Sequence, residues 1–331
     1  MSASKNLITD VPGLSVGIAQ DAKLGSGVTV VLFDEPAVAS IAIHGGAPGV
    51  RDTALLEPEM TVERVDALAL SGGSVFGLDA MGGVISALRE KGRGFAIGDA
   101  RAPIVPGAVL FDLLNGGDKN WGRKPPYWEF GFEAAERAAQ EFALGSAGAG
   151  LGANTANLKG GLGSASAVTS TGYRVGALVA VNALGQATIG YGPHFWAAPF
   201  ERGAEFGGVG WPVAIPPAAL ALRLQTDRLE NTTIAIVATD APLTKPQAKR
   251  LAIQAHDGLA QALRPAHAAL DGDTVFSAAT ARNPRPPQPR ELAEIGMACA
   301  DALARAIARG VYEATALPFE GALPTWRGRY G

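Results

Sequence analysis

Short apolar runs rich in valine, isoleucine and alanine constrain the fold of this chain more than any other feature. Three of them occupy residues 27–33, 37–43 and 67–70, and glycine, proline or aspartate residues bound them. Runs of this kind are typical of strands buried on both faces, because a strand with one wet face alternates apolar and polar residues. Doubly buried strands need covering helices, so the runs predict an α/β protein.

Four segments have the pattern of such helices. The clearest covers residues 290–309, where apolar residues recur every three or four positions, with glutamates in the first turn and arginines in the last. Another begins after Thr244, which can cap a helix whose first turn accepts Pro246. We expect two more over residues 74–91 and 132–142, the former fed directly by a strand.

The remaining segments complete the pattern of a single domain. A glycine-dense loop at 145–163 leads into a β-like section at 165–189, and residues 232–239 and 274–279 predict two further strands. The chain has 43 glycines in 331 residues, concentrated between the apolar runs, which indicates tight turns and close backbone approach. No long linker separates two cores, so we expect one α/β domain over residues 1–331.

Composition excludes several classes of protein. The 28 Lys and Arg against 31 Asp and Glu residues include no basic run, so nucleic acid and anionic membranes are not expected partners. The sequence has no run of about 18 apolar residues, so no membrane span is predicted. Its first residues lack the apolar segment of a secretion signal. Cys299 is the single cysteine, which excludes an intramolecular disulfide. We expect a cytoplasmic protein whose partner is a small molecule or short peptide.

Three motifs suggest cofactors or known catalytic sites but do not fit. The glycine-rich stretch 145–161 lacks the Gly-Lys-Ser/Thr of a phosphate loop. Ser74 lacks the glycine two residues later that a nucleophile elbow requires, because Phe76 stands there. Residues 271–273, Asp-Gly-Asp, begin like a calcium loop, but the later carboxylates are missing. We therefore expect no cofactor.

The four histidines are scattered along the sequence, at His44, His194, His256 and His267. None is spaced as a metal-binding pair on a helix face, so each is expected to be a structural or surface histidine, and no metal site is predicted. A Ser-His-Asp triad has no obvious histidine either. A hydrolase built from this sequence would need another base.

Thr232 offers such a base. It stands in Asn-Thr-Thr, where a polar segment, residues 225–231, meets a β-branched strand. If the peptide bond before Thr232 were cut, one residue would hold both a hydroxyl nucleophile and a free α-amine as base. An α-amine pKa of about 7.7 to 8.0 leaves a useful neutral fraction at physiological pH. On spacing alone, the favoured interpretation is that Thr232 merely opens a strand.

The chain resembles the family of self-processing N-terminal-nucleophile hydrolases that includes the L-aminopeptidase/D-esterase DmpA, the β-peptidyl aminopeptidases and the nylon-oligomer hydrolase. The resemblance runs nearly end to end in ordered blocks. These are ITDVPGLSVG (8–17), GGAPGVRDTALLEP (45–58), LSGGSVFGLDA (70–80), PIVPGAVLFDL (103–113), GANTANLKGGLGSAS (152–166), VAVNALG (179–185), NTTIAIVATDAPLTK (231–245) and DGDTVFSAAT (271–280). Aminopeptidase members cut before serine and carry Ser-x-Glu downstream, whereas this chain has Asn-Thr and Asp-Gly-Asp, similar to the nylon-oligomer hydrolase branch.

The resemblance implies an αββα sandwich with two central sheets and helices on both outer faces. It also implies self-cleavage between Asn231 and Thr232, which would leave chains 1–231 and 232–331. The two chains would stay together and assemble further into a homo-oligomer, with a tetramer of the cleaved heterodimers favoured.

Site residues also follow from the resemblance. Thr232 matches the family nucleophile, and Asn182 matches the asparagine that donates toward the developing oxyanion. Lys159 matches a lysine that holds the threonine hydroxyl and amine and keeps that amine neutral, and Asp271 and Asp273 match the carboxylates that orient them. Outside the family, Asn182 could be a turn residue, Lys159 a surface lysine and the aspartates a turn before a strand. Residues predicted to line the substrate cleft are Ser71, Gly72 and Gly73.

The predicted activity is hydrolysis of linear aliphatic amides such as 6-aminohexanoate oligomers. An aminopeptidase, a β-peptidyl aminopeptidase or a D-amino acid esterase of the same family is the alternative. A second alternative is an acyl transferase similar to the ornithine acetyltransferases, which would require an acyl-acceptor pocket.

Overall fold

The computed structural model describes residues 4–222 and 231–331. Within them, nine strands form one hydrogen-bonded network in the order β3-β7-β4-β2-β11-β10-β9-β8, with β1 paired to β2. The strands are β1 (Leu14–Asp21), β2 (Ser26–Ile43), β3 (Gly49–Arg51), β4 (Arg64–Ser71), β7 (Gly107–Val109), β8 (Gly161–Val168), β9 (Arg174–Val181), β10 (Ile234–Thr239) and β11 (Thr274–Ala279). A separate hairpin joins β5 (Phe95–Ile97) to β6 (Ala100–Ala102).

Strand β2 connects the two halves of this network. Its first part pairs antiparallel with β1 and β4, and its last part pairs antiparallel with β11. The register with β4 shifts between Leu32 and Ala37, where the strand passes from one sheet to the other. The apolar runs at 27–33 and 37–43 are therefore one continuous strand, not two.

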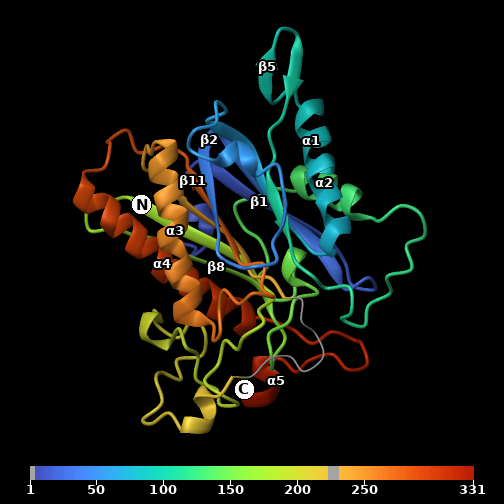
Figure 1. The fold of residues 1–331 in the computed structure, drawn as a ribbon, viewed down its shortest axis with the longest axis vertical. Coiled ribbons are helices and arrows are strands. Elements are labelled where there is room, and N and C mark those ends of the chain that lie inside the picture. Colours follow the sequence, from blue (N-terminus) through green and yellow to red (C-terminus); the bar gives the residue numbers. More distant parts are fainter. Residues whose placement is uncertain (1–3, 223–230) are drawn as a thin grey trace.

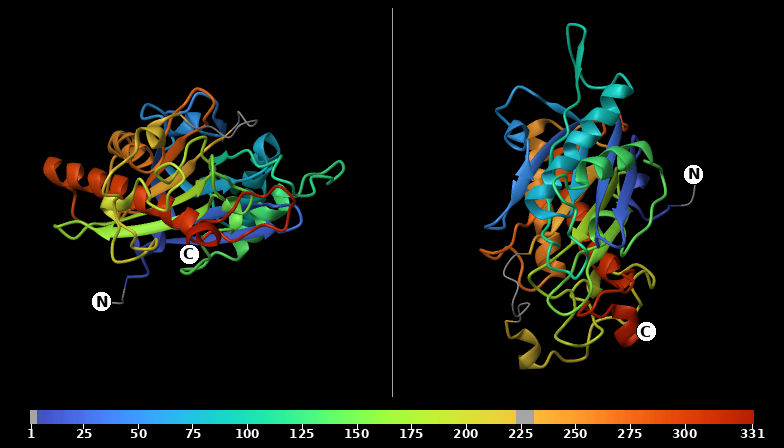
Figure 2. Two further views of the ribbon diagram at one scale, coloured as in Figure 1. Left: turned by 90° about the horizontal axis from the view of Figure 1, so that it is seen from below. Right: turned by 90° about the vertical axis from the view of Figure 1, so that its right-hand side faces the viewer.

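The layers confirm the expected αββα sandwich. Helices α3 (Lys245–Ala262) and α4 (Pro289–Tyr312) cover one sheet, and α1 (Ala80–Glu90) and α2 (Tyr127–Glu136) cover the other (Figures 1 and 2). One apolar cluster lies under each helix pair, and a third fills the space between the sheets. Members of this middle cluster include Leu14, Phe33, Leu70, Leu178, Ile236 and Phe276. The doubly buried strands predicted from the sequence are thus confirmed.

Two of the four predicted helices agree closely with the structure. In α3 the Thr244 hydroxyl accepts the Gln247 N–H, as expected of a capping box. Helix α4 contains all of residues 290–309. A terminal α5 (Trp326–Tyr330) was not predicted.

The other two helices begin at different residues. Residues Ser74–Asp79 form a 3-10 helix, and only Ala80–Glu90 are α-helical. Helix α2 spans Tyr127–Glu136, so the prediction for 132–142 was wrong over its second half. There Ala139 exchanges backbone hydrogen bonds of 2.9 and 3.0 Å with Val16 on the outer edge of β1, which removes those groups from a helix.

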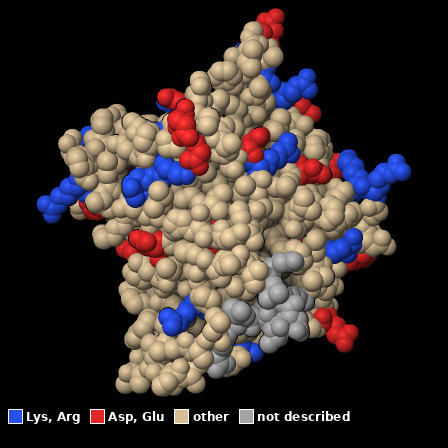
Figure 3. All heavy atoms as spheres, in the orientation of Figure 1, with Lys and Arg blue, Asp and Glu red and all other residues tan. Residues whose placement is uncertain are grey.

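The surface carries mixed charge on the face drawn in Figure 3. Lysine and arginine side chains are interspersed with aspartate and glutamate around a largely uncharged centre. None of the helices in residues 4–222 and 231–331 has the length and apolar character needed to cross a membrane.

Candidate active site

Thr232 lies immediately before the central strand β10, at the end of the space between the two sheets. Its side chain is 6% exposed. The Thr232 N–H donates to the backbone carbonyl of Asn182 at 2.7 Å, and its hydroxyl donates to the carbonyl oxygen of Asn231 at 2.7 Å. The hydroxyl therefore lies against the peptide bond that self-cleavage would break.

The Asn231 carbonyl has a second donor. It accepts the backbone N–H of Gly272 at 3.0 Å. Strands β10 and β11 run parallel with Ile234 opposite Thr274, which places Gly272 beside Thr232. A Cβ on Gly272 would lie 2.6 Å from the Thr232 hydroxyl oxygen, so the close approach of the two segments requires glycine here.

The two aspartates lie just before β11 and contact the residues on either side of Thr232. Asp271 and Asp273 are both 1% exposed. Asn231 pairs with Asp271 in a parallel bridge, and Asp273 Oδ1 accepts the Thr233 N–H at 3.1 Å. The β10–β11 register thus brings both carboxylates to the residues that flank Thr232.

Burial and the neighbouring charge act on the pair together. Desolvation, and then the negative charge of Asp273, raise the pKa of Asp271 well above its ordinary value. Two carboxylates this close in a dry site resist being ionised together. Asp273 Oδ2 accepts the His267 backbone N–H at 2.8 Å and pairs with His267 Nδ1 at 2.9 Å.

Lys159 is fully buried but does not meet Thr232 directly. Its ammonium donates to the backbone carbonyls of Gly150, Ala153 and Gly160 at 3.1, 2.7 and 2.9 Å. Burial lowers the pKa of Lys159 to about 7, although the charge of Asp112 opposes the shift. In the uncut chain, Lys159 anchors the glycine-rich loop instead of the threonine hydroxyl.

Asn182, the residue after β9, links this loop to Thr232. Its Oδ1 accepts the Asn154 N–H at 2.9 Å, and its Nδ2 donates to the Phe111 carbonyl at 3.1 Å. Its backbone carbonyl accepts the Thr232 N–H, so Asn182 contacts both the glycine-rich loop and Thr232.

A cavity of about 510 Å³ opens onto Thr232. Among its described lining residues none is charged, and Thr232, Asn231 and Ser74 bring its polar side chains. The lining consists of Ala47, Pro48, Gly49, Val50, Ser74, Val75, Leu78, Val109, Leu110, Phe111, Asn231, Thr232 and Leu270.

The predicted cleft residues Ser71, Gly72 and Gly73 stand just before this wall. The Ser71 hydroxyl donates to the Gly72 carbonyl at 2.9 Å, and the Gly73 N–H donates to Asp112 Oδ1 at 2.8 Å. They shape the turn that presents the next two residues, Ser74 and Val75, to the cavity.

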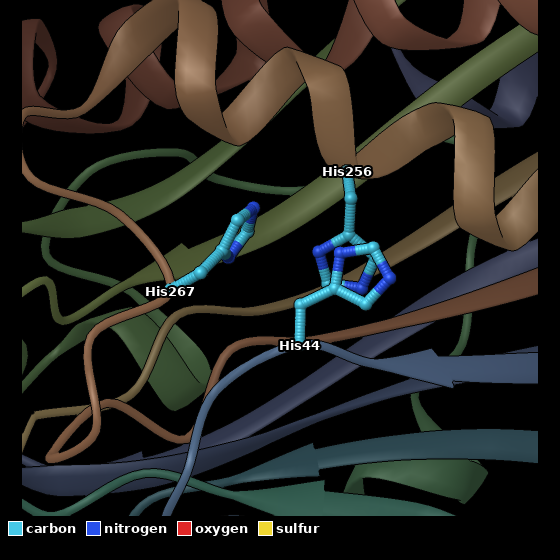
Figure 4. A group of neighbouring side chains, drawn as sticks. All are labelled: His44, His256 and His267. Atoms are coloured by element: carbon cyan, nitrogen blue, oxygen red, sulfur yellow. The ribbon is translucent and has the colours of Figure 1, made fainter.

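The histidines differ most from the sequence-based expectation. His44, His256 and His267 are not scattered but meet in one cluster (Figure 4), in which His267 also contacts Asp273. The rings of His44 and His256 stack with centroids 3.8 Å apart, and His267 meets both edge-on. Sequence spacing could not reveal the cluster, because it forms only when β2, α3 and the loop before β11 pack together. His194 lies apart, with Nδ1 2.9 Å from the Gly210 carbonyl oxygen.

The structure thus places a buried threonine at an apolar cavity within an αββα sandwich, next to residues that contact two buried carboxylates. The model of Peptidase family S58 matches residues 6–322, and the chain belongs to this family. It is accordingly a hydrolase.

Curated relatives carry two kinds of name. An uncharacterized aminopeptidase of Mycobacterium tuberculosis is 43% identical over 348 residues, covering 97% of each chain. A 6-aminohexanoate-oligomer endohydrolase of a Kocuria species is 29% identical over 286 residues, covering 82% of this chain and 74% of the relative. Identity is thus higher to a protein named as an aminopeptidase than to the nylon-oligomer enzyme.

Solved structures share the fold. A β-aminopeptidase from a Burkholderia species superposes with a TM-score of 0.71 at 22% identity, covering 99% of this chain and 92% of that one. The L-aminopeptidase D-Ala-esterase/amidase of Ochrobactrum anthropi, described as a variant of the N-terminal-nucleophile hydrolase fold, gives 0.69 at 20% identity over 98% and 92%.

Proposed function

We propose that this protein is a self-processing N-terminal threonine amidohydrolase that acts on linear aliphatic amides such as 6-aminohexanoate oligomers. One observation carries the proposal. The buried Thr232 hydroxyl lies 2.7 Å from the carbonyl oxygen of Asn231 and at the wall of an uncharged cavity.

Self-cleavage follows from the contacts around that peptide bond. The Thr232 hydroxyl oxygen attacks the Asn231 carbonyl carbon, and negative charge develops on the carbonyl oxygen that already accepts the Gly272 N–H. We assign Asp273, which accepts the N–H of the neighbouring Thr233, as the base that takes the hydroxyl proton. Collapse breaks the C–N bond, returns the proton to the Thr232 nitrogen and leaves an ester. Water then hydrolyses the ester to an Asn231 carboxylate and a free Thr232 amine.

Turnover uses the amine that cleavage releases. The Thr232 hydroxyl attacks the substrate carbonyl while its amine takes the proton and passes it to the leaving amine. Water then hydrolyses the acyl ester. The Asn182 amide is the oxyanion donor, a contact of the kind worth about 10² to 10³ in rate. Lys159, when protonated, favours the neutral form of the amine.

The cavity supports an unbranched apolar substrate. Its walls come from alanine, glycine, valine, leucine and phenylalanine, and its described lining offers no charged side chain to hold a substrate terminus. Such walls discriminate by only about 1 to 3 kcal/mol per methylene, so side activity on peptide-like amides is expected.

An aminopeptidase is the second candidate, supported by the 43% identity to a protein of that name. Self-cleavage would also place a negative charge at the wall of the cavity, whose described lining residues are all uncharged. The new α-carboxylate of Asn231, a lining residue, could pair with the free amine of a substrate. The two candidates therefore differ in whether the substrate needs a free amino end.

The cleaved halves are expected to remain together. Strands β10 and β11 belong to the small fragment, yet they lie between β9 and β2 of the large one. The β5–β6 hairpin projects from the body (Figure 1) and exposes Phe95 and Ile97, which supports further assembly into a homo-oligomer. We expect this homo-oligomer to be a tetramer and the protein to be cytoplasmic. Native mass spectrometry would measure that assembly.

Two measurements test the proposed function. A denaturing mass spectrum should show fragments of 231 and 100 residues (331 − 231 = 100), and an intact, fully active chain would contradict the mechanism. Hydrolysis rates on an aminohexanoate oligomer with a free or an acetylated amino end then separate the candidates. Similar rates favour the endo-acting amidase, whereas strict dependence on the free amine identifies an aminopeptidase.

A further inference from the structure

Three imidazoles converge beside the active site without a role in the proposed hydrolysis. His44 follows β2, His256 lies on α3, and His267 precedes β11. One ring nitrogen from each can be chosen so that all three lie within 4.8 Å of one another. Figure 4 shows ring nitrogens of His44 and His256 on the side that faces His267.

The hydrogen bonds of His256 leave one nitrogen without a partner. Its Nε2 lies 2.9 Å from the Ala42 carbonyl oxygen, which can only accept, so Nε2 carries the proton. Nδ1 therefore holds a lone pair. It is buried and has no hydrogen-bond partner among the described residues, in a side chain only 1% exposed. An orphaned buried acceptor of this kind requires an explanation.

His267, like His256, has one ring nitrogen held by an oxygen acceptor. Its Nδ1 donates to Asp273 Oδ2 at 2.9 Å, which leaves Nε2 as the second nitrogen. A histidine that donates one N–H to a carbonyl or a carboxylate is oriented as metal-bound histidines usually are.

His44 supplies the third nitrogen, and its side chain can turn to complete the set. It is exposed and lies nearly parallel to His256, with 17° between the ring planes. Stacked rings do not point their lone pairs at one spot, so His44 must turn toward His267 to complete the set. Its exposed position permits this turn and leaves a fourth position to solvent.

We propose that His44, His256 and His267 form a binding site for a divalent transition metal of the Zn²⁺ type, with water as the fourth ligand. Three imidazoles and an open position suit zinc and its neighbours, whereas calcium and magnesium prefer oxygen ligands.

The site would act on the nucleophile through Asp273. A metal on His267 Nε2 strengthens the donation from Nδ1 to Asp273 Oδ2, while Oδ1 of the same carboxylate accepts the Thr233 N–H. The three histidines are thus positioning residues, since none of them lines the cavity at Thr232.

Cobalt titration tests the site without reference to activity. The protein without an affinity tag is stripped with a chelator, dialysed and titrated with Co²⁺ as a spectroscopic probe. We expect one equivalent to produce the visible bands of a tetrahedral nitrogen-ligated ion, which Zn²⁺ then displaces stoichiometrically. The absence of saturable binding near one equivalent would overturn the proposal.

Variants locate the bound ion. His44→Ala removes an exposed ligand and should weaken Co²⁺ binding at least about 100-fold. Loss of an outer-shell partner of a metal ligand can already cost about 100-fold in affinity, and loss of a ligand itself should cost no less. His194→Ala, outside the cluster, should leave binding unchanged. The uncut Thr232→Ala variant should also bind normally, which separates this site from any chelation by a new amino terminus. Unchanged binding in His44→Ala, or equal loss in His194→Ala, would refute the assignment.

Discussion

Replacing Gly272 by alanine tests whether the β10–β11 register holds Thr232, the proposed nucleophile, in its working position. The backbone at Gly272 does not require glycine, since its φ is not in the positive range, so alanine is resisted only by contacts. The new Cβ would lie 2.6 Å from Thr232 Oγ1 and 2.8 Å from the Ala47 carbonyl oxygen. Ordinary contact begins at 3.4 Å, so the hydroxyl must shift by roughly 0.8 Å.

A shift of this size should lower the reaction rate strongly and the stability of the fold only moderately. Misplacing a reacting group by about 1 Å can cost about 10²-fold in rate, whereas overpacking typically costs about 1–3 kcal/mol of stability. We therefore expect Gly272→Ala to slow both self-cleavage and amide hydrolysis by about 10²-fold, while the protein remains folded. Electrophoresis over time, initial rates and thermal unfolding measure the three quantities.

Gly192→Ala is the matched control. Its Cβ would meet the Ile189 carbonyl oxygen at 3.4 Å and His194 Cδ2 at 4.0 Å, both ordinary contacts, and its φ is also outside the positive range. This variant should mature and turn over normally. Wild-type cleavage and hydrolysis in Gly272→Ala would refute the placement of Thr232 as the nucleophile at this contact.

Three further predictions concern the same site. Thr232→Ala should give a folded, uncut, inactive chain and Thr232→Ser should retain some processing; loss of cleavage in Thr233→Ala alone would move the nucleophile by one residue. Asp273→Asn and Lys159→Ala should each slow maturation and turnover together, and normal rates at unchanged assembly would reduce both residues to structural roles. Because burial lowers the pKa of Lys159 to about 7 from its usual 10.5, the unfolded chain binds more protons between these values. Stability should therefore rise with pH across that window, and urea unfolding in the uncut Thr232→Ala background should show less of this rise after Lys159→Met.

Local signals in the sequence were sufficient wherever neighbouring residues decide the structure. Thr244 caps α3 because its partner is only three residues away, and Thr274–Ala279 form a strand because their own composition demands burial. The family blocks placed Thr232, Asn182, Asp271 and Asp273 in one prediction, and the structure brings all four together.

Long-range pairing decided what the sequence alone could not. The runs at 27–33 and 37–43 are one strand because β4 and β11 pair with its two halves, and residues 137–142 leave the helical pattern because β1 offers an unpaired edge. The direct partners of Lys159 are backbone carbonyls that no side-chain motif encodes. The histidine cluster unites residues separated by more than two hundred positions, because periodicity reports only which face of an element is buried, whereas packing determines which faces meet.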